Sequence, residues 1–306
     1  MTKEDTNKVH GNNEHRDKIN LVYYAKYRAN WPIFGKNFVN GNKDNIDLIV
    51  NGKHYELTDK YLLEEDNIVT IVIKNKLTDL SGMFEGCYYL KDFTELKYLD
   101  VSHVKSFSHM FYGCTQITDI NFLQNWNVSS SNSLMFMLFN CQSLIDIKAL
   151  ENWDVSNCKS FYGMFYGCES LIDLKYLHNW NVSNGTCFEG MFSNCKKLTD
   201  ISGLQNWNVS NCINFKSMFS KCSNITSSMP LKNWNVSNGK EFDSMFTQCS
   251  SLLDSKGFEK WDVSNANSLT WMFRECSNLK EIESLMNCDV SNCNNFSSMF
   301  YDVLLY

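Results

Sequence analysis

The chain has 306 residues, 43% of them apolar, and its 28 basic and 34 acidic side chains give a net charge of −6. A mildly acidic chain has no electrostatic reason to bind nucleic acid or an anionic membrane surface. No apolar run approaches the roughly 18–20 residues that a membrane span needs. We therefore expect neither a nucleic-acid partner nor a membrane span.

The first 76 residues differ from the rest of the chain. Residues 1–18 are polar and mixed in charge, without the apolar core of a secretory signal, and we expect a disordered tail. The absence of that core favours a cytoplasmic or otherwise intracellular location, with the cell surface as the alternative. In residues 19–76, a segment at 46–50, the pair Asn51-Gly52 and a segment at 54–57 predict a β-hairpin with a tight turn. A further strand is predicted at 68–73, and we interpret 19–76 as an N-terminal cap.

From residue 77 to 306 the sequence repeats. Eight cysteines are spaced 27 residues apart, and a methionine stands four residues before each of them and before Val303. A constant period of 20–50 residues is typical of repeat architectures in which each unit packs on its neighbours. The chain therefore contains nine units, whose cysteines and methionines are Cys87, Cys114, Cys141, Cys168, Cys195, Cys222, Cys249, Cys276, Met83, Met110, Met137, Met164, Met191, Met218, Met245, Met272 and Met299.

One unit, residues 154–180, serves to predict local structure. Four apolar side chains at i, i+3, i+4 and i+7 predict one face of a short helix, with Ser156 or Asn157 as its N-cap; they are Phe161, Met164, Phe165 and Cys168. Leucines then follow at 171, 174 and 177, with the spacing of a leucine-rich repeat and a short strand predicted at 172–174. We expect the equivalent phenylalanines to be buried, namely Phe107, Phe161, Phe188, Phe215, Phe242 and Phe296.

These elements predict an overall shape. Neighbouring strands lie about 4.8 Å apart, whereas neighbouring helices need about 8–10 Å. A row of such units must curve toward its strands. The predicted fold is an α/β repeat, a curved leucine-rich-repeat-like solenoid of strand-plus-short-helix units with a strand-lined concave face and a small β-rich cap.

The recurring motifs Asn-Trp-Asn/Asp-Val-Ser-Asn, Met-Phe-x-x-Cys and Leu-x-x-Leu resemble those of the BspA-like leucine-rich-repeat surface proteins, over roughly residues 77–303. The resemblance implies protein–protein interaction, often adhesion, and neither a cofactor nor a catalytic residue. Members at cell surfaces usually carry an export signal or a lipid anchor, and none is visible here.

The cysteine series has three interpretations: disulfides, metal ligands or core thiols. Residues one unit apart on stacked helices would lie about 8–10 Å apart, whereas a disulfide needs Cα atoms within about 7 Å. Close pairs such as Cys-x-x-Cys, common in metal sites, do not occur. We interpret the cysteines as core thiols, which favours a reducing compartment.

Two further series have structural and functional interpretations. The tryptophans at 126, 153, 180, 207, 234 and 261 form either a sugar-binding row or a corner of the core, and we favour the core. Glycosylation sequons at Asn127, Asn181, Asn208 and Asn235 share their register with aspartates, which glycosylation cannot use but a turn can. We expect turns.

An acidic series lies five residues after the repeat cysteine, on the predicted strand, and Ser227 is its one neutral member. Its acidic members are Asp92, Asp119, Asp146, Asp173, Asp200, Asp254 and Glu281. Stacked carboxylates repel one another unless something offsets their charge. Either hydrogen bonds in turns offset it, or a cation or a basic protein partner binds the row. Lys148, Lys175 and Lys256, two residues further on, would also partly neutralise the row. We take the row as the candidate binding site.

Residues for catalysis are scarce. The six histidines do not recur with the repeat, and no phosphate-binding glycine loop or nucleophile motif is present. We expect a non-catalytic protein-binding scaffold, with a surface adhesin as the alternative function, and no enzyme, cofactor or metal. The ninth unit stops after its predicted helix, at residues 300–306, and no polar cap follows. Three interpretations stay open: residues 300–306 are themselves the cap, this end of the row pairs with a second copy, or the sequence is truncated.

Overall fold

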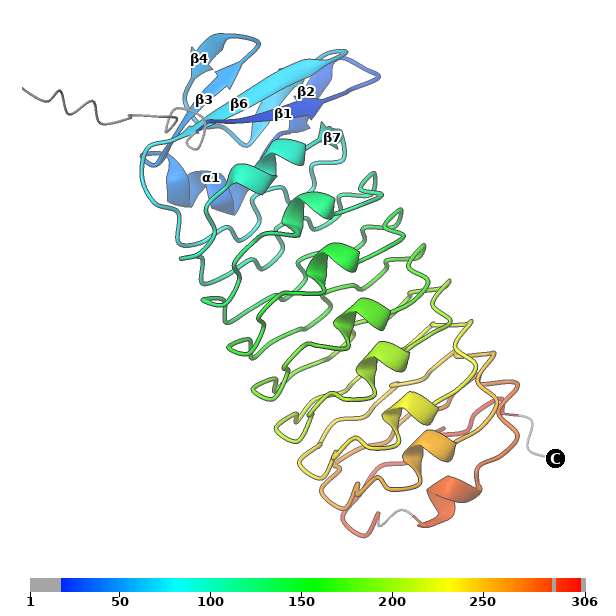
Figure 1. Cartoon of the computed structure of the whole chain (residues 1–306). Coiled ribbons are helices and arrows are strands. Elements are labelled where there is room, and N and C mark those ends of the chain that lie inside the picture. The colour runs from blue at the N-terminus through cyan, green and yellow to red at the C-terminus, as the bar shows by residue number, and fades with distance from the viewer. Residues whose placement is uncertain (1–17, 288–289, 304–306) are drawn as a thin grey trace, which may run out of the picture.

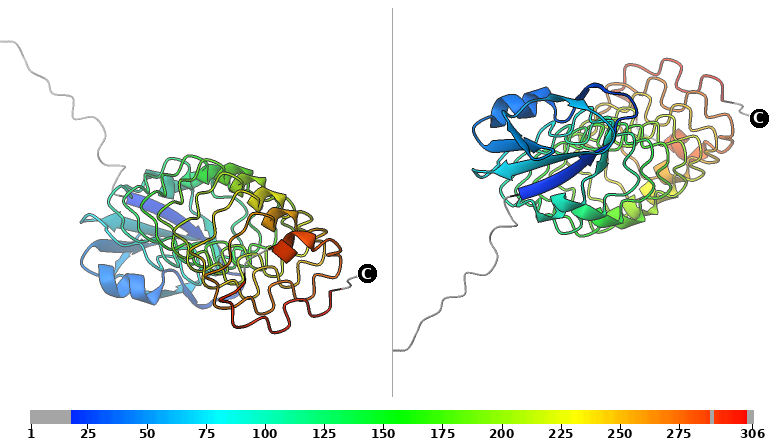
Figure 2. Two further views of the ribbon diagram at one scale, coloured as in Figure 1. Left: turned by 90° about the horizontal axis from the view of Figure 1, so that it is seen from below. Right: turned by 90° about the horizontal axis from the view of Figure 1, so that it is seen from above.

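The structure is a computed structural model that describes residues 18–287 and 290–303. Figure 1 shows a β-rich part at one end and a long row of similar units leading away from it. The two end-on views in Figure 2 show the same row foreshortened, with the β-rich part at its start. The predicted tail at 1–18 lies outside the described residues, apart from Lys18, which begins the first strand.

The β-rich part contains two sheets and one helix. The larger sheet has the order β4-β3-β6-β1-β7, and β2 pairs with β5. Asn51 and Gly52 join β3 to β4 with φ of 48° and 79°, as a tight hairpin turn requires. The predicted hairpin is confirmed, although β4 is shorter than expected, and the strand predicted at 68–73 is confirmed as β6. The elements are β1 (Lys18–Tyr23), β2 (Ala29–Pro32), α1 (Lys36–Asn42), β3 (Ile46–Val50), β4 (Lys53–Tyr55), β5 (Lys60–Leu63), β6 (Asn67–Ile73) and β7 (Leu90–Asp92).

This part joins directly onto the first repeat unit. Strand β7 belongs to that unit and pairs with β1, with Tyr23 opposite Leu90. The backbone N–H of Gly35 donates to the carbonyl oxygen of Met83 at 3.1 Å. Nearby, the ring of Phe34 packs 5.9 Å from that of Phe84. The first unit is therefore covered by the β-rich part on the side away from the second unit.

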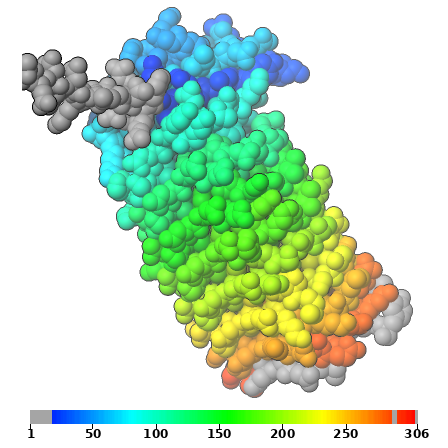
Figure 3. Space-filling model, in the orientation of Figure 1, coloured from blue at the N-terminus to red at the C-terminus, as the bar shows by residue number. Residues whose placement is uncertain are grey.

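The repeat units are held together by a ladder of backbone hydrogen bonds. The N–H of Phe165 donates to the carbonyl oxygen of Met191 in the next unit at 2.9 Å, whereas the N–H of Met164 donates back to Phe161 at 3.1 Å. This alternation of one bond between units and one turn within the unit recurs along the row. The chain is therefore a repeat protein whose neighbouring units are hydrogen-bonded to each other, and Figure 3 shows them packed into one elongated body.

The predicted short helix at the phenylalanine and methionine positions is wrong. Residues 162–167 form consecutive turns, with φ of 56° at Gly163 and 71° at Gly167. A residue in the left-handed region cannot continue a right-handed helix. Successive turns nevertheless bring Phe161, Phe165 and Cys168 to the same buried side. The apolar spacing was correct, but two turns in series satisfy it as well as a helix does.

The helical segments lie instead in the leucine stretch, as short 3-10 helices that Figure 1 shows one beside the next along one side of the row. The strand predicted there is reduced to the isolated bridges Asp173–Asp200 and Asp254–Glu281, apart from β7 in the first unit. The predicted strand-lined concave face is therefore not formed in residues 18–287 and 290–303. The 3-10 helices are η1 (Thr94–Tyr98), η2 (Asn121–Leu123), η3 (Lys148–Leu150), η4 (Lys175–Leu177), η5 (Ser202–Leu204), η6 (Met229–Leu231), η7 (Lys256–Phe258) and η8 (Glu283–Asn287).

The core runs through the units as stacked aromatic rings. Phe215 lies 6.3 Å from Phe188 and 5.3 Å from Phe242, with nearly parallel planes. Five of the six phenylalanines predicted to be buried have no exposed surface. Phe296 is the exception at 41% exposure, because no unit in the described part of the chain packs on its outer side.

Candidate functional site

The acidic row lies where each 3-10 helix begins. In the six aspartates of the row one side-chain oxygen, Oδ1, accepts a hydrogen bond from the N–H of the helix's first residue. Asp146 accepts from Lys148 at 2.6 Å and Asp200 from Ser202 at 2.8 Å. The same bond is made by Asp92, Asp119, Asp173 and Asp254, and by the Oγ of Ser227. Since short polar side chains favour this turn, one oxygen of each aspartate carboxylate has a structural role.

The members of the row differ in what the second oxygen of each carboxylate contacts. Oδ2 of Asp173 contacts the ammonium group of Lys175 at 3.0 Å, and Glu281 contacts Lys256 at 2.9 Å. The hydrogen bond with Asp173 raises the pKa of Lys175. Within residues 18–287 and 290–303, the structure gives no ion pair to Asp146 or Asp200, and both are exposed. The row therefore presents carboxylate oxygens to solvent that are only partly neutralised.

A shallow cavity of about 300 Å³ lies at the start of the row, between its first two members, Asp92 and Asp119. Lys91, Lys97 and Phe122 also line it. The cavity therefore combines carboxylates, ammonium groups and an aromatic ring, a mixture suited to a polar side chain of a partner.

The cysteine series is part of the core, as predicted. The Sγ of Cys222 donates to the carbonyl oxygen of Phe192 at 3.0 Å, and the same contact links Cys195 to Phe165 at 3.2 Å. Burial raises the pKa of both Cys114 and Cys222 to about 12. These thiols therefore stay protonated at neutral pH and are poor nucleophiles or metal ligands.

The tryptophan and Val-Ser series also have the structural roles predicted for them. Trp207 is buried and donates from Nε1 to the carbonyl oxygen of Leu177 at 2.9 Å. Oδ1 of Asn208 accepts from the N–H of Ser210, and Asp262 makes the same bond to Ser264. Either residue thus closes the same turn.

A cluster of half-buried aromatic side chains in the second to fourth units was not predicted from the sequence. The rings of Tyr112, Phe139 and Tyr166 stack at 4.4 and 4.5 Å between centroids. Beside them Phe136 has φ of 55°, which is costly for an aromatic residue. Its ring occupies space that a Cβ at Gly163 would enter. Aromatic residues recurring two positions after the methionine were the available sequence signal.

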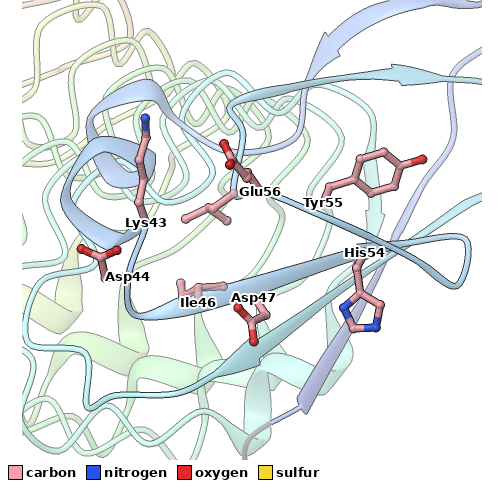
Figure 4. A pocket seen from close by; sticks show the side chains of 8 residues that line it. Lys43, Asp44, Ile46, Asp47, His54, Tyr55 and Glu56 are labelled. Carbon is pink, nitrogen blue, oxygen red and sulfur yellow. The ribbon is translucent and has the colours of Figure 1, made fainter.

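A larger pocket of about 610 Å³ lies in the β-rich part. Figure 4 shows Lys43 and Asp44 toward one end of it, and His54 and Tyr55 toward the other. Asp47 is engaged by Lys74 at 2.9 Å. These side chains do not converge on one point. In the described residues, no group of three or more His, Cys, Asp or Glu side chains could hold a metal ion, and no helix is long and apolar enough to cross a membrane.

Comparison with known protein families identifies a family for the repeat region. A family model described as "Mycoplasma protein of unknown function, DUF285" matches three overlapping segments, residues 78–202, 172–284 and 231–305. No curated protein matches the chain in sequence. The matched segments together span most of the chain, so the protein belongs to this family.

Proposed function

From membership of this repeat family and from the row of carboxylates, we propose that the protein is a non-catalytic scaffold that binds a protein partner with basic surface charge. The observation that carries the proposal is one acidic side chain from nearly every unit, in register beside the 3-10 helices. Repeat proteins commonly bind partners on such extended surfaces. Long-range attraction from the row would speed association and weaken with salt.

The hydrogen bonds of the row make a precise test possible. Asn keeps the Oδ1 acceptor that Lys148 and Lys175 require and removes only the charge. The double variant Asp146→Asn/Asp173→Asn should therefore leave the melting temperature nearly unchanged. Its binding of a fluorescent twelve-residue Lys/Arg peptide, followed by anisotropy in low salt, should weaken several-fold.

A matched control removes the same charge elsewhere. Asp154→Asn/Asp262→Asn changes positions where other units already carry Asn, and it should leave peptide binding unchanged. Equal weakening by both pairs would show that net charge alone drives binding. A loss of several kcal/mol in stability for Asp146→Asn/Asp173→Asn would instead assign the row a purely structural role. Either result would overturn the proposal.

We also propose, as the finer interpretation of the fold, that the units are relatives of leucine-rich repeats of the BspA-like type. The Leu-x-x-Leu spacing of 171, 174 and 177 supports this, since all three leucines are buried. For location we propose a reducing, intracellular compartment. The free thiols among the described cysteines support it.

A second candidate function is that of a cell-surface adhesin. The aromatic cluster around Tyr112, Phe139 and Tyr166 favours it, because aromatic residues dominate contacts at protein interfaces. Tyr112→Ser/Tyr166→Ser should then reduce adhesion of the purified protein to host cells, whereas Asp146→Asn/Asp173→Asn should not. The reverse result would favour the acidic row.

A further inference from the structure

A second row of exposed side chains runs directly beside the acidic row. It consists of the residue before each acidic position, and Ile145 and Ile172, in neighbouring units, are 52% and 46% exposed. The N–H of Ile145 donates to the carbonyl oxygen of Thr118 at 3.3 Å, and the N–H of Thr199 to that of Ile172 at 2.9 Å, so successive members are direct neighbours. We call it the aliphatic row, and its members are Thr118, Ile145, Ile172, Thr199, Thr226 and Leu253, with Lys91 and Lys280 at its ends.

Methyl groups and carboxylates therefore lie side by side in the second to fifth units. Of the four carboxylates there, Asp173 alone has an ion pair within residues 18–287 and 290–303, to Lys175 at 3.0 Å. The two-row face, defined by residues 118–119, 145–146, 172–173 and 199–200, thus offers an apolar strip parallel to a negative strip. Exposed apolar side chains in a continuous arrangement are typical of interaction sites. The complementary surface is an apolar strip with cations along one side.

The spacing of the units decides which secondary structure can follow both rows. A parallel bridge joins Asp173 to Asp200, and bridged segments lie about 4.8 Å apart. An α-helix advances about 5.4 Å per turn, whereas a strand returns a side chain to the same face about every 6.7 Å. From the second unit to the fifth, a helix loses register by about 2 Å and a strand by about 6 Å, which exceeds one unit. The face therefore matches one helical turn per unit.

We propose that the two-row face binds an amphipathic α-helix of the partner protein, about three turns long. The apolar stripe of this helix packs on Ile145 and Ile172, and its lysine or arginine side chains lie over Asp146 and Asp200. Recognition of an amphipathic helix through one apolar stripe is a common mode of peptide binding. The inference rests on the function proposed above and adds the conformation of the ligand and an apolar contact.

Lysines on the far side of the carboxylates restrict how the helix is rotated about its axis. Lys148 and Lys175 follow the acidic row by two residues and are exposed. Cations placed over the carboxylates are attracted, whereas cations placed further out would meet these two ammonium groups and be repelled. The partner helix therefore carries its cations next to the apolar stripe, on the side of the acidic row, and none beyond them.

Two labelled eighteen-residue peptides of identical composition, made of leucine, lysine and alanine, test the conformation. In the helical-order peptide, leucine recurs every third or fourth residue with a lysine beside each. In the alternating peptide, leucine recurs at every other residue. Binding to the full chain is followed by anisotropy and by far-UV circular dichroism. We expect the helical-order peptide to become helical on binding and the alternating peptide to bind about tenfold more weakly, because few of its leucines can stay beside the aliphatic row.

A substitution in the aliphatic row tests the apolar contact. Ile145→Thr/Ile172→Thr introduces the residue that the second, fifth and sixth units already carry there, so the fold is kept, and binding of the helical-order peptide should weaken about tenfold. Ile213→Thr is the matched control. Ile213 is 48% exposed but lies in a different row, where the preceding unit carries Thr186. It should leave binding unchanged.

The outcomes separate this inference from the function on which it rests. Equal binding of the two peptides, no gain of helix on binding, or no effect of Ile145→Thr/Ile172→Thr would overturn the helix. The charge-driven scaffold would still stand if Asp146→Asn/Asp173→Asn weakened binding of both peptides. If Asp146→Asn/Asp173→Asn left the binding of both unchanged, the proposed function would fail and the helix with it.

Discussion

The thiol of Cys222 donates a hydrogen bond to the backbone carbonyl oxygen of Phe192, 3.0 Å away in the preceding unit. That carbonyl also accepts the N–H of Cys195 at 3.2 Å, so one oxygen closes a turn and binds the next unit. The same contact recurs in the seven units from Cys114 to Cys276, which explains why a cysteine occupies this position there. A small, buried side chain with one weak donor satisfies the second lone pair of each carbonyl.

This arrangement predicts how the cysteines react. Because burial raises the pKa of thiols such as Cys114 and Cys276 to about 12, little thiolate forms at pH 8. The native chain should therefore resist alkylation by iodoacetamide at the eight register positions. Unfolding in guanidinium without reductant should expose 13 reactive thiols, as the sequence contains 13 cysteines. Mass spectrometry of the alkylated protein measures both, and recovery of only one or three thiols would contradict the prediction.

The turn before each repeat cysteine predicts the effect of adding one methyl group. Gly167 has φ of 71°, and a Cβ there would lie 2.1 Å from Oδ1 of Asn140. Gly167→Ala should therefore lower the free energy of unfolding by about 1–2 kcal/mol, the cost of a left-handed residue without glycine, and more if Asn140 cannot move. Lys221→Ala, at the equivalent position in the sixth unit, is the control and should change stability little, because Lys221 already has a Cβ at φ of 63°. Urea unfolding measures both, and equal losses would refute the steric argument.

The sequence predicted which residues are buried better than it predicted the backbone that buries them. Apolar side chains at i, i+3, i+4 and i+7 fit one face of a helix, but consecutive turns give the same side. Two glycines four residues apart, Gly163 and Gly167, were the contrary signal, because glycine is unfavourable inside a helix and favourable at φ above zero. The N–H groups that a helix would use internally bond instead to the next unit, which no local pattern shows.

The acidic row illustrates a second limit. Its register was readable from the sequence, and so was the idea that turn hydrogen bonds could offset the repulsion between carboxylates. Which oxygen of Asp146 is used, and by which N–H, depends on the 3-10 helix that follows it, an element too short to leave a periodic signal. The aromatic cluster was not predicted because only some units carry an aromatic residue two positions after the repeat methionine.

The Val-Ser turns predict a dependence of stability on pH. The hydroxyl and N–H of Ser264 hold the pKa of Asp262 below its usual range, and Ser102 does the same for Asp100. A carboxyl with a lowered folded-state pKa stabilises the fold above its unfolded pKa, near 3.9, and loses this contribution as pH falls through the folded-state pKa. The urea midpoint of Asp100→Asn/Asp262→Asn, which lacks these two titrating groups, should thus fall less than the native midpoint between pH 7 and pH 3.

The reverse substitution is the control for that experiment. Asn208 closes the same turn as Asp262 but cannot titrate, so Asn208→Asp should enlarge the fall of the urea midpoint between pH 7 and pH 3. A difference between variants that is the same at pH 3 and pH 7 would show that ionisation of these turns does not contribute.

The position of a phenylalanine along the row should decide how much it stabilises the fold. Phe215 has neighbouring units on both sides and no exposed surface, so Phe215→Ala leaves a cavity and should cost about 3–5 kcal/mol. Phe296 has the same place in its unit but is 41% exposed, and Phe296→Ala should cost well under half as much. Urea unfolding followed by tryptophan fluorescence compares the two variants. Because each unit contacts only its neighbours, hydrogen exchange in Phe215→Ala should increase most in the fifth to seventh units. Similar costs for the two substitutions would contradict the prediction that burial between two neighbouring units sets the cost.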